Sequence, residues 1–257
     1  MKMLIGHSGL LGKTLQDSCQ FDLLYNSKNI HEFRDAPEDC DAYLSCLPAT
    51  KWLINKDPNK DMELALNLIE LFKTKRFKTI VLFSTIDVYC DSPTEVDESF
   101  DPICNGLNYG SNRYRFEQMV ANELSYDRLK ILRLPALFGK HIKKNVLFDL
   151  LNNNQTENIN LNSRFQWYDL QNLMIDVNAC LQKEQVVFNL FPEPVETADI
   201  ANLFPQYHLT NFGKRIDYNY KTRYSDSGYI LSKETCLTQI QSFVNNYESI
   251  RKSTEPS

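Results

Sequence analysis

The first nineteen residues constrain the fold more than any other part of the chain. An apolar run at 1–5 is followed at once by Gly6, Gly9 and Gly12, and residues 13–19 are typical of a helix. Glycines in such a turn let backbone N–H groups approach a phosphate at the N-terminus of the following helix. The order of strand, glycine turn and helix therefore predicts a pyrophosphate-binding turn, and a turn without a ligand is the alternative.

Further strands and helices alternate along the chain. Short apolar runs predict strands, and longer segments with apolar residues every three or four positions predict helices. Strands are expected at 21–25, 41–47, 79–83 and 129–134, and helices at 61–73, 109–126, 146–151, 199–204 and 233–247. In the last of these, Cys236, Ile240 and Phe243 share one face, which indicates a helix that docks on the rest of the protein.

Composition excludes several classes of protein. The 257 residues carry a net charge of −5 without a basic block, which argues against nucleic acid or an anionic membrane as the main partner. No run reaches the roughly 18 apolar residues that a membrane-spanning helix needs. The chain enters its first strand directly, so we expect no signal peptide and a cytoplasmic protein. Seven cysteines without a CxxC pair fit reduced thiols, and we assign no metal ligands.

A second group of polar residues lies between positions 84 and 113. Ser84 and Thr85 end a β-rich run, while Tyr109 opens a predicted helix and Arg113 follows four residues later. A tyrosine can move a proton, a nearby hydroxyl can orient it, and a cation favours the phenolate. These are the groups that a hydride-transfer site needs, so Ser84, Thr85, Tyr109 and Arg113 are candidate catalytic residues.

Taken together, these motifs resemble the short-chain dehydrogenase/reductase superfamily, in particular the extended NAD-dependent epimerase/dehydratase family that modifies nucleotide sugars. The glycines are spaced GxxGxxG, residues 84–89 match S-[ST]-x-x-V-Y, and residues 109–113 correspond to the Y-G-x-S-K helix start. The resemblance implies an α/β fold, with a Rossmann-like doubly wound parallel sheet and a small C-terminal substrate-binding lobe. We expect a cofactor-binding core at 1–140, with 141–257 adding the lobe and the last sheet elements.

The resemblance also implies which residues bind the cofactor. They are Gly6, Ser8, Gly9, Leu10, Leu11, Gly12, Asn26, Ser27, Lys28, Cys46, Leu47, Pro48 and Pro135. About 20 residues after the first glycine, an acidic residue usually binds the ribose diol of NAD, whereas this chain has Asn26-Ser27-Lys28. A cation suits a 2′-phosphate, so NADP(H) is favoured and NAD(H) is the alternative. Lys28 as a solvated loop lysine is the other interpretation.

In the family, the tyrosine is the general acid/base and the hydroxyl binds the same substrate oxygen, which implies these roles for Tyr109 and for Thr85 with Ser84. Arg113 stands where the family has a lysine that holds the nicotinamide ribose. Arginine is a permanent cation that can orient the ribose and favour the phenolate, but it does not readily give up a proton. We therefore expect the pKa of Tyr109 to lie below its usual value of roughly 10.

Asp87 leaves the reaction type open. The family's dehydratases use a Thr-Asp-Glu triplet for elimination, and here the triplet is Thr85-Ile86-Asp87. A turn-forming Asp87 is the favoured interpretation, so we expect an oxidoreductase or epimerase. A 4,6-dehydratase and a non-catalytic cofactor-binding module are the alternatives. The expected substrate is a small nucleotide sugar that contacts Tyr89, Lys144, Asn145 and Arg164. The resemblance further implies a homodimer through the helices at 61–73 and 109–126.

Overall fold

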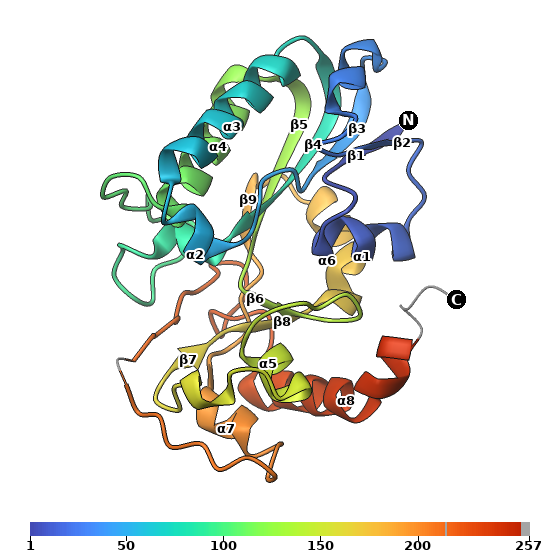
Figure 1. Ribbon diagram of the computed structural model, residues 1–257. Helices are drawn as coiled ribbons and strands as arrows, with labels where there is room; N and C mark the ends of the chain where they lie inside the picture. The colour runs from blue at the N-terminus through green and yellow to red at the C-terminus, as the bar shows by residue number, and fades with distance from the viewer. Residues whose placement is uncertain (214, 253–257) are drawn as a thin grey trace. The chain divides into compact units, whose positions relative to one another are not determined.

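The computed structural model describes residues 1–213 and 215–252 (Figure 1). Residue 214 and residues 253–257, which belong to the expected C-terminal segment, lie outside the described residues. The chain forms two compact units whose segments alternate along the sequence. Unit 1 contains Met1–Pro93, Glu98–Arg133 and Leu173–Asn189, and unit 2 contains Thr94–Asp97, Leu134–Asn172 and the chain from Leu190 onward. Within the segment expected at 141–257, Leu173–Asn189 therefore belongs to unit 1, and the rest of the described residues belong to unit 2.

Unit 1 is built on a six-stranded sheet with the order β2-β1-β3-β4-β5-β9. The strands are β1 (Lys2–Ile5), β2 (Leu23–Tyr25), β3 (Cys40–Leu44), β4 (Arg76–Thr85), β5 (Ser125–Leu134) and β9 (Val187–Asn189). β1 pairs in parallel with β2 and β3, β3 with β4, and β5 with β9. The prediction of a Rossmann-like parallel sheet is confirmed, and every strand expected in this unit is present with ends shifted by a few residues.

The helices of unit 1 cover both faces of this sheet. They are α1 (Leu10–Ser18), α2 (Lys51–Ile54), α3 (Pro58–Phe72), α4 (Tyr109–Glu123) and α6 (Leu173–Leu181), with 3-10 turns η1 (Ile30–Asp35) and η2 (Ile86–Tyr89). Figure 1 shows α3 and α4 side by side on one face and α1 with α6 on the other. The doubly wound arrangement follows from this placement.

The two long helices start where their sequences supply caps. Asp57 accepts a hydrogen bond from the Lys60 N–H at the start of α3, and Pro58 occupies the first helical position. Asn108 accepts from the Ser111 N–H in the same way at the start of α4. These caps satisfy backbone donors that a helix leaves unpaired, and they fix where Tyr109 enters its helix.

The core of unit 1 lies between the sheet and its helices. Ile80, Val81 and Leu82 are consecutive buried residues of β4, as expected for a parallel strand that is covered on both faces. Ile80 and Leu82 form one cluster with Ile69 and Phe72 of α3. Burial of each such side chain contributes roughly 1.5–3 kcal/mol, so the sheet and the two helices form a rigid support for the residues at the strand ends.

Unit 2 combines short strands and helices. β6 (Ala136–Phe138) pairs in parallel with β8 (Trp167–Asp169), and β7 (Arg164–Phe165) pairs antiparallel with β10 (Val195–Glu196). The remaining elements are α5 (Val146–Asn152), η3 (Thr156–Asn158), η4 (Leu170–Asn172), α7 (Thr197–Ala201) and α8 (Lys233–Lys252).

The apolar face predicted for α8 is confirmed, because Cys236, Ile240 and Phe243 are buried in a cluster with Phe138 and Trp167. The helix extends beyond the predicted end at 247. In the part of the chain that the structure describes, no helix combines the length and apolar character needed to cross a membrane.

Candidate active site

The glycine turn lies at the carboxyl end of β1, where the chain passes to β2 on one side while β3 pairs on the other. In open α/β sheets, ligands bind at such a switch point. Gly6 has φ 97°, and a Cβ there would lie 2.2 Å from the carbonyl oxygen of Ser45. A Cβ on Gly12 would lie 2.3 Å from the carbonyl oxygen of Gly6. Both positions therefore require glycine for the turn to pack against β3 and α1.

The N-terminus of α1 fits an anion. Gly9 is the N-cap residue and has no side chain, so no side-chain cap competes for the first N–H groups of the helix. The first turn, which includes Leu10 and Leu11, also contains no acidic residue. Ser8 and Gly9 are exposed. Backbone donors and the positive end of the helix dipole favour a phosphate at this place, so the residues present fit the pyrophosphate of a dinucleotide.

The loop after β2 is held against the glycine turn by a hydrogen bond that the sequence did not indicate. The Asn26 side-chain oxygen accepts from the Lys28 N–H at 2.8 Å, which fixes the amide orientation. The Asn26 Nδ2 therefore donates to the His7 Nε2, also at 2.8 Å. Ser27 and Lys28 are exposed beside this contact. The loop therefore lies next to the glycine turn, and the Ser27 and Lys28 side chains face solvent.

The end of β3 contributes backbone to the same edge of the sheet. The strand ends at Leu44, earlier than the predicted 47, and Cys46 and Leu47 are partly buried. The exposed Pro48 accepts a hydrogen bond at its carbonyl oxygen from Arg113 Nη2 at 2.5 Å. This bond joins the segment after β3 to the helix that carries Tyr109.

Thr85 and Tyr109 are brought together at the carboxyl end of β4. Thr85 is the last residue of β4, and its hydroxyl accepts from the Asp87 N–H at 3.2 Å. Tyr109 begins α4, and its own N–H donates to the Asn55 side chain at 2.8 Å. A Cβ on Gly110 would lie 1.9 Å from the carbonyl oxygen of Asp87. Glycine at position 110 therefore lets α4 approach η2 closely enough for the two side chains to meet.

The expected lowering of the Tyr109 pKa is wrong for this structure. Burial raises the pKa of Tyr109 above its usual value, and the Asp87 carboxylate acts in the same direction. The Arg113 charge and a hydrogen bond with Thr85 act to lower the pKa, but they do not outweigh burial. Desolvation disfavours a phenolate in a buried site even when a cation lies nearby. Tyr109 is therefore a neutral phenol near pH 7.

Arg113 has a partner that the sequence reasoning missed. Its Nη1 and Nη2 donate to the two carboxylate oxygens of Asp61 at 2.8 and 3.0 Å. Both side chains are buried, with exposed fractions of 7% and 4%. The guanidinium carbon lies 4.7 Å from the centre of the Tyr109 ring. The predicted ribose contact thus competes with a buried ion pair and with the bond to Pro48, which together occupy the guanidinium fork.

Ser84 and Tyr89 lie in a separate buried network. The Ser84 hydroxyl donates to Glu117, which also accepts two bonds from the Arg133 Nε and one from its Nη2 at 2.6 Å. Arg133 Nη1 donates to the Tyr89 hydroxyl at 2.5 Å, and Asn189 donates to the same oxygen at 3.1 Å. Tyr89 is 0% exposed. These contacts argue against the predicted roles of Tyr89 in substrate binding and of Ser84 in catalysis.

Asp87 forms an ion pair at the edge of the site. Its Oδ1 lies 2.5 Å from the Nζ of Lys51, which begins the short helix α2. The Thr85 hydroxyl is 3.4 Å from the other carboxylate oxygen. The Asp87 carboxylate thus contacts both Lys51 of α2 and the last residue of β4. Lys51 was not predicted, because a lysine that opens a four-residue helix has no distinctive sequence signal.

The remaining predicted residues lie in unit 2, where they have local partners. Asn145 caps α5 by accepting from the Phe148 N–H at 3.0 Å, and its Nδ2 donates to the Leu137 carbonyl at 2.8 Å. Arg164 donates to both carboxylate oxygens of Asp217 at 2.7 and 3.1 Å. Lys144 is exposed and Pro135 is buried. The cap role explains Asn145 without a ligand.

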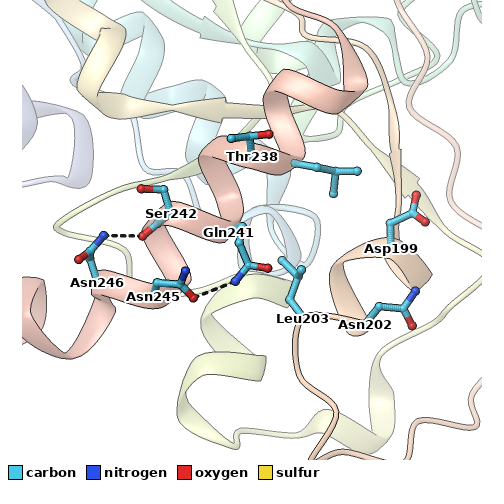
Figure 2. Close-up of a pocket in the computed structure, with 9 residues that line it drawn as sticks. Asp199, Asn202, Leu203, Thr238, Gln241, Ser242, Asn245 and Asn246 are labelled. Carbon is cyan, nitrogen blue, oxygen red and sulfur yellow. Dashed lines mark hydrogen bonds between the residues drawn. The ribbon is translucent and has the colours of Figure 1, made fainter.

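A hollow of about 600 Å³ lies between α7 and α8 of unit 2 (Figure 2). Asp199, Leu203 and Gln241 are among the residues that line it. Figure 2 shows Gln241 bonded to Asn245 along α8, at 2.8 Å. No predicted site residue lines this hollow. Some of the polar side chains that line it are hydrogen-bonded to one another. It is therefore distinct from the residues gathered at the end of β4.

No protein-family model and no curated protein matches the chain. Solved structures do match it. MoeE5 in complex with UDP-glucuronic acid and NAD is similar with a TM-score of 0.70 at 12% identity, covering 96% of this chain and 99% of that one. UDP-N-acetylglucosamine 4-epimerase from Bacillus cereus is similar with a TM-score of 0.62 at 15% identity, covering 95% and 99%.

A third similar structure is dTDP-4-dehydrorhamnose reductase from Bacillus anthracis in complex with NADP. Its TM-score is 0.67 at 15% identity, covering 93% of this chain and 97% of that one. All three likenesses span nearly the full length of both chains. The chain therefore has a Rossmann-like α/β fold, which it shares with these structures.

Proposed function

We propose that this protein is an NAD(P)-dependent oxidoreductase or epimerase that acts on a nucleotide-activated sugar. One observation carries the proposal: the Tyr109 phenol, the Thr85 hydroxyl and the Arg113 guanidinium gather at the carboxyl end of β4. The same sheet carries the glycine turn at its switch point. The similar structures support the substrate class, because they include an epimerase, a reductase and a complex with UDP-glucuronic acid.

In this proposal, Tyr109 exchanges a proton with the sugar oxygen at the reacting carbon, and Thr85 donates or accepts a hydrogen bond at the same oxygen. A general acid/base of this kind typically accelerates a reaction by about 10²–10⁴-fold. Gly6, Gly9 and Gly12 shape the turn that binds the pyrophosphate. The nicotinamide of a bound cofactor would supply or accept the hydride at the sugar carbon.

We further propose that NADP(H) is preferred over NAD(H). The loop after β2 offers Ser27 and Lys28 to solvent beside the glycine turn, and it contains no carboxylate that would bind a ribose diol. Fluorescence titration with NADPH and NADH tests the preference. Lys28→Ala should weaken NADPH binding by roughly tenfold and leave NADH unchanged, since one charged hydrogen bond is lost. Lys78→Ala, an exposed lysine of β4, is the matched control.

For the substrate, Lys144 and Arg164 are the proposed contacts of the nucleotide diphosphate, because cations suit phosphate oxygens. The test is a panel of UDP- and dTDP-sugars incubated with NADPH or NADH and analysed by mass spectrometry. A reductase consumes one reduced cofactor per product, and an epimerase interconverts isomers without net consumption. A 4-keto-6-deoxy product would instead support a dehydratase that uses Asp87. Cofactor binding without turnover of any sugar would support a non-catalytic binding module.

A further inference from the structure

Asp61 is a buried carboxylate that the proposed chemistry does not yet use. It lies in the first turn of α3, accepts both bonds of the Arg113 fork, and accepts a third from the Asn112 Nδ2 at 2.9 Å. A buried carboxylate with three charge-assisted or amide donors is firmly held in one orientation. Because Arg113 also donates to Pro48, the guanidinium plane is fixed from two sides beside the Tyr109 ring.

The charges around Tyr109 are balanced. Arg113 faces it from α4, Asp61 faces it from α3, and Asp87 faces it from η2. The Asp87 carboxylate is itself paired with Lys51 of α2. One cation and two carboxylates therefore act on the phenol, and each carboxylate is paired with a cation. A cation whose charge is neutralised at 2.8 and 3.0 Å stabilises a phenolate much less than a free one does.

We propose that Asp61 is a positioning residue that holds Arg113 against Tyr109 and cancels its charge, so that the resting enzyme keeps Tyr109 as a proton donor and takes the keto form of its sugar substrate. This inference rests on the proposed function for the direction of the chemistry, while the balance of charge is a property of the chain alone. The raised pKa of Tyr109 is in agreement with it.

The consequence for the reaction follows from the protonation state. In carbonyl reduction, the carbonyl carbon gains the hydride of a reduced nicotinamide, and the oxygen gains the proton that the Tyr109 phenol loses. The phenolate then regains a proton from solvent, so the carbonyl is reduced and the nicotinamide is oxidised. Alcohol oxidation would require Tyr109 to lose its proton first. The neutral phenol is therefore the form that reduction needs at the outset.

The test is a spectrophotometric titration of Tyr109 in the full chain without cofactor or substrate. Phenolate absorbance is recorded against pH for the wild type and for Asp61→Asn, each with and without Tyr109→Phe, and the difference isolates Tyr109. Asp61→Asn removes the carboxylate that neutralises Arg113, so the pKa of Tyr109 should fall by at least one unit, a tenfold change in the ionisation constant. Glu63→Gln, which makes the same change on the exposed side of α3, should leave the titration in place.

An unchanged or raised pKa in Asp61→Asn would overturn the proposal. An unpaired buried arginine can prevent folding of Asp61→Asn. The double variant Asp61→Asn/Arg113→Gln has no unpaired arginine at this place, so the pKa of Tyr109 is measured in it as a second test. Both charges are then absent, and the titration of Tyr109 should match the wild type; a marked rise would show that the Arg113 charge is not cancelled and would also overturn the proposal. The titration uses no substrate. Its result therefore tests the role of Asp61 even if the nucleotide-sugar assay finds no activity.

Discussion

Helix α4 takes part in two buried ion pairs of the same chemistry, one turn apart, that differ in what surrounds them. Arg113 pairs with Asp61, and Glu117 pairs with Arg133 of β5. In both pairs the guanidinium lies over a tyrosine ring, at 4.7 Å for Tyr109 and 4.9 Å for Tyr89. The pairs therefore resemble one another in charge, burial and aromatic contact, and their difference lies in the tyrosine.

The Tyr89 hydroxyl accepts directly from Arg133 and from Asn189, and burial raises the pKa of Tyr89 to about 12. Its hydrogen-bonding capacity is used inside unit 1. Tyr109 instead lies at the end of β4 beside Thr85, and the Arg113 fork is bonded to Asp61 and Pro48. The comparison teaches that the hydroxyl beside the Arg133 pair is bonded within the fold, whereas the Arg113 pair lies beside the tyrosine that we propose exchanges a proton.

The largest expected effect is on the Arg133 pair. Glu117→Gln leaves Arg133 buried without its carboxylate, and one amide oxygen remains to accept from both Arg133 and the Ser84 hydroxyl. Breaking one partner of a buried pair costs about 3–5 kcal/mol, so the free energy of unfolding in urea should fall by that amount. Glu123→Gln near the end of the same helix, where the pair with Lys73 is exposed, should cost less than about 1 kcal/mol. Equal losses in the two variants would remove the distinction.

A conservative exchange at both arginines sharpens the comparison. Arg133→Lys cannot bond Glu117 and Tyr89 at once through a planar fork, and it should lower the free energy of unfolding by about 2–3 kcal/mol. Arg113→Lys keeps a cation near Tyr109 and Asp61, so it should cost about 1–2 kcal/mol while sugar turnover is retained. Urea denaturation measures the free energy of unfolding of both variants, and the nucleotide-sugar assay measures the turnover of Arg113→Lys. Loss of turnover in Arg113→Lys with an intact fold would contradict this account of the pair.

The smallest effect concerns the third pair, Lys51 with Asp87, whose side chains are 46% and 13% exposed. Lys51→Gln should change the free energy of unfolding by less than about 1 kcal/mol, because exposed pairs are screened by solvent. It also leaves the Asp87 carboxylate unneutralised beside Tyr109, so the pKa of Tyr109 should rise slightly in the same absorbance titration. If Lys51→Gln lowered the free energy of unfolding as much as Glu117→Gln does, the exposure of an ion pair would not explain how much the pair contributes to stability.

The fold was predictable because its signals are local. The glycine spacing requires a turn between a strand and a helix, and Gly6 and Gly12 occupy positions where a Cβ would clash. The apolar runs of the strands and the periodicity of α3 are likewise set within each segment. Small elements that depend on tertiary contacts, such as α2 and η1, were not predicted.

The site was predictable only in part. The positions of Thr85 and Tyr109 follow from their motifs, but the partner of Arg113 lies 52 residues away in the sequence. Tyr89 was expected to contact the substrate, whereas its hydroxyl accepts a hydrogen bond from Arg133, 44 residues away in the sequence. The predicted direction of the Tyr109 pKa shift was wrong for the same reason. Burial depends on how the whole unit packs, and its effect on the pKa outweighs that of the nearby Arg113 cation.

The central claim is that Tyr109, and not Tyr89, exchanges the proton in the proposed reaction. The most direct measurement is sugar turnover and cofactor affinity in Tyr109→Phe, with Tyr126→Phe as a control because that hydroxyl donates only to a backbone carbonyl of its own region, the Ala121 oxygen at 2.7 Å. Tyr109→Phe should reduce turnover by about 10²–10⁴-fold with cofactor affinity unchanged, and Tyr126→Phe should retain activity. Full turnover in Tyr109→Phe on a sugar that the wild type converts would contradict the claim.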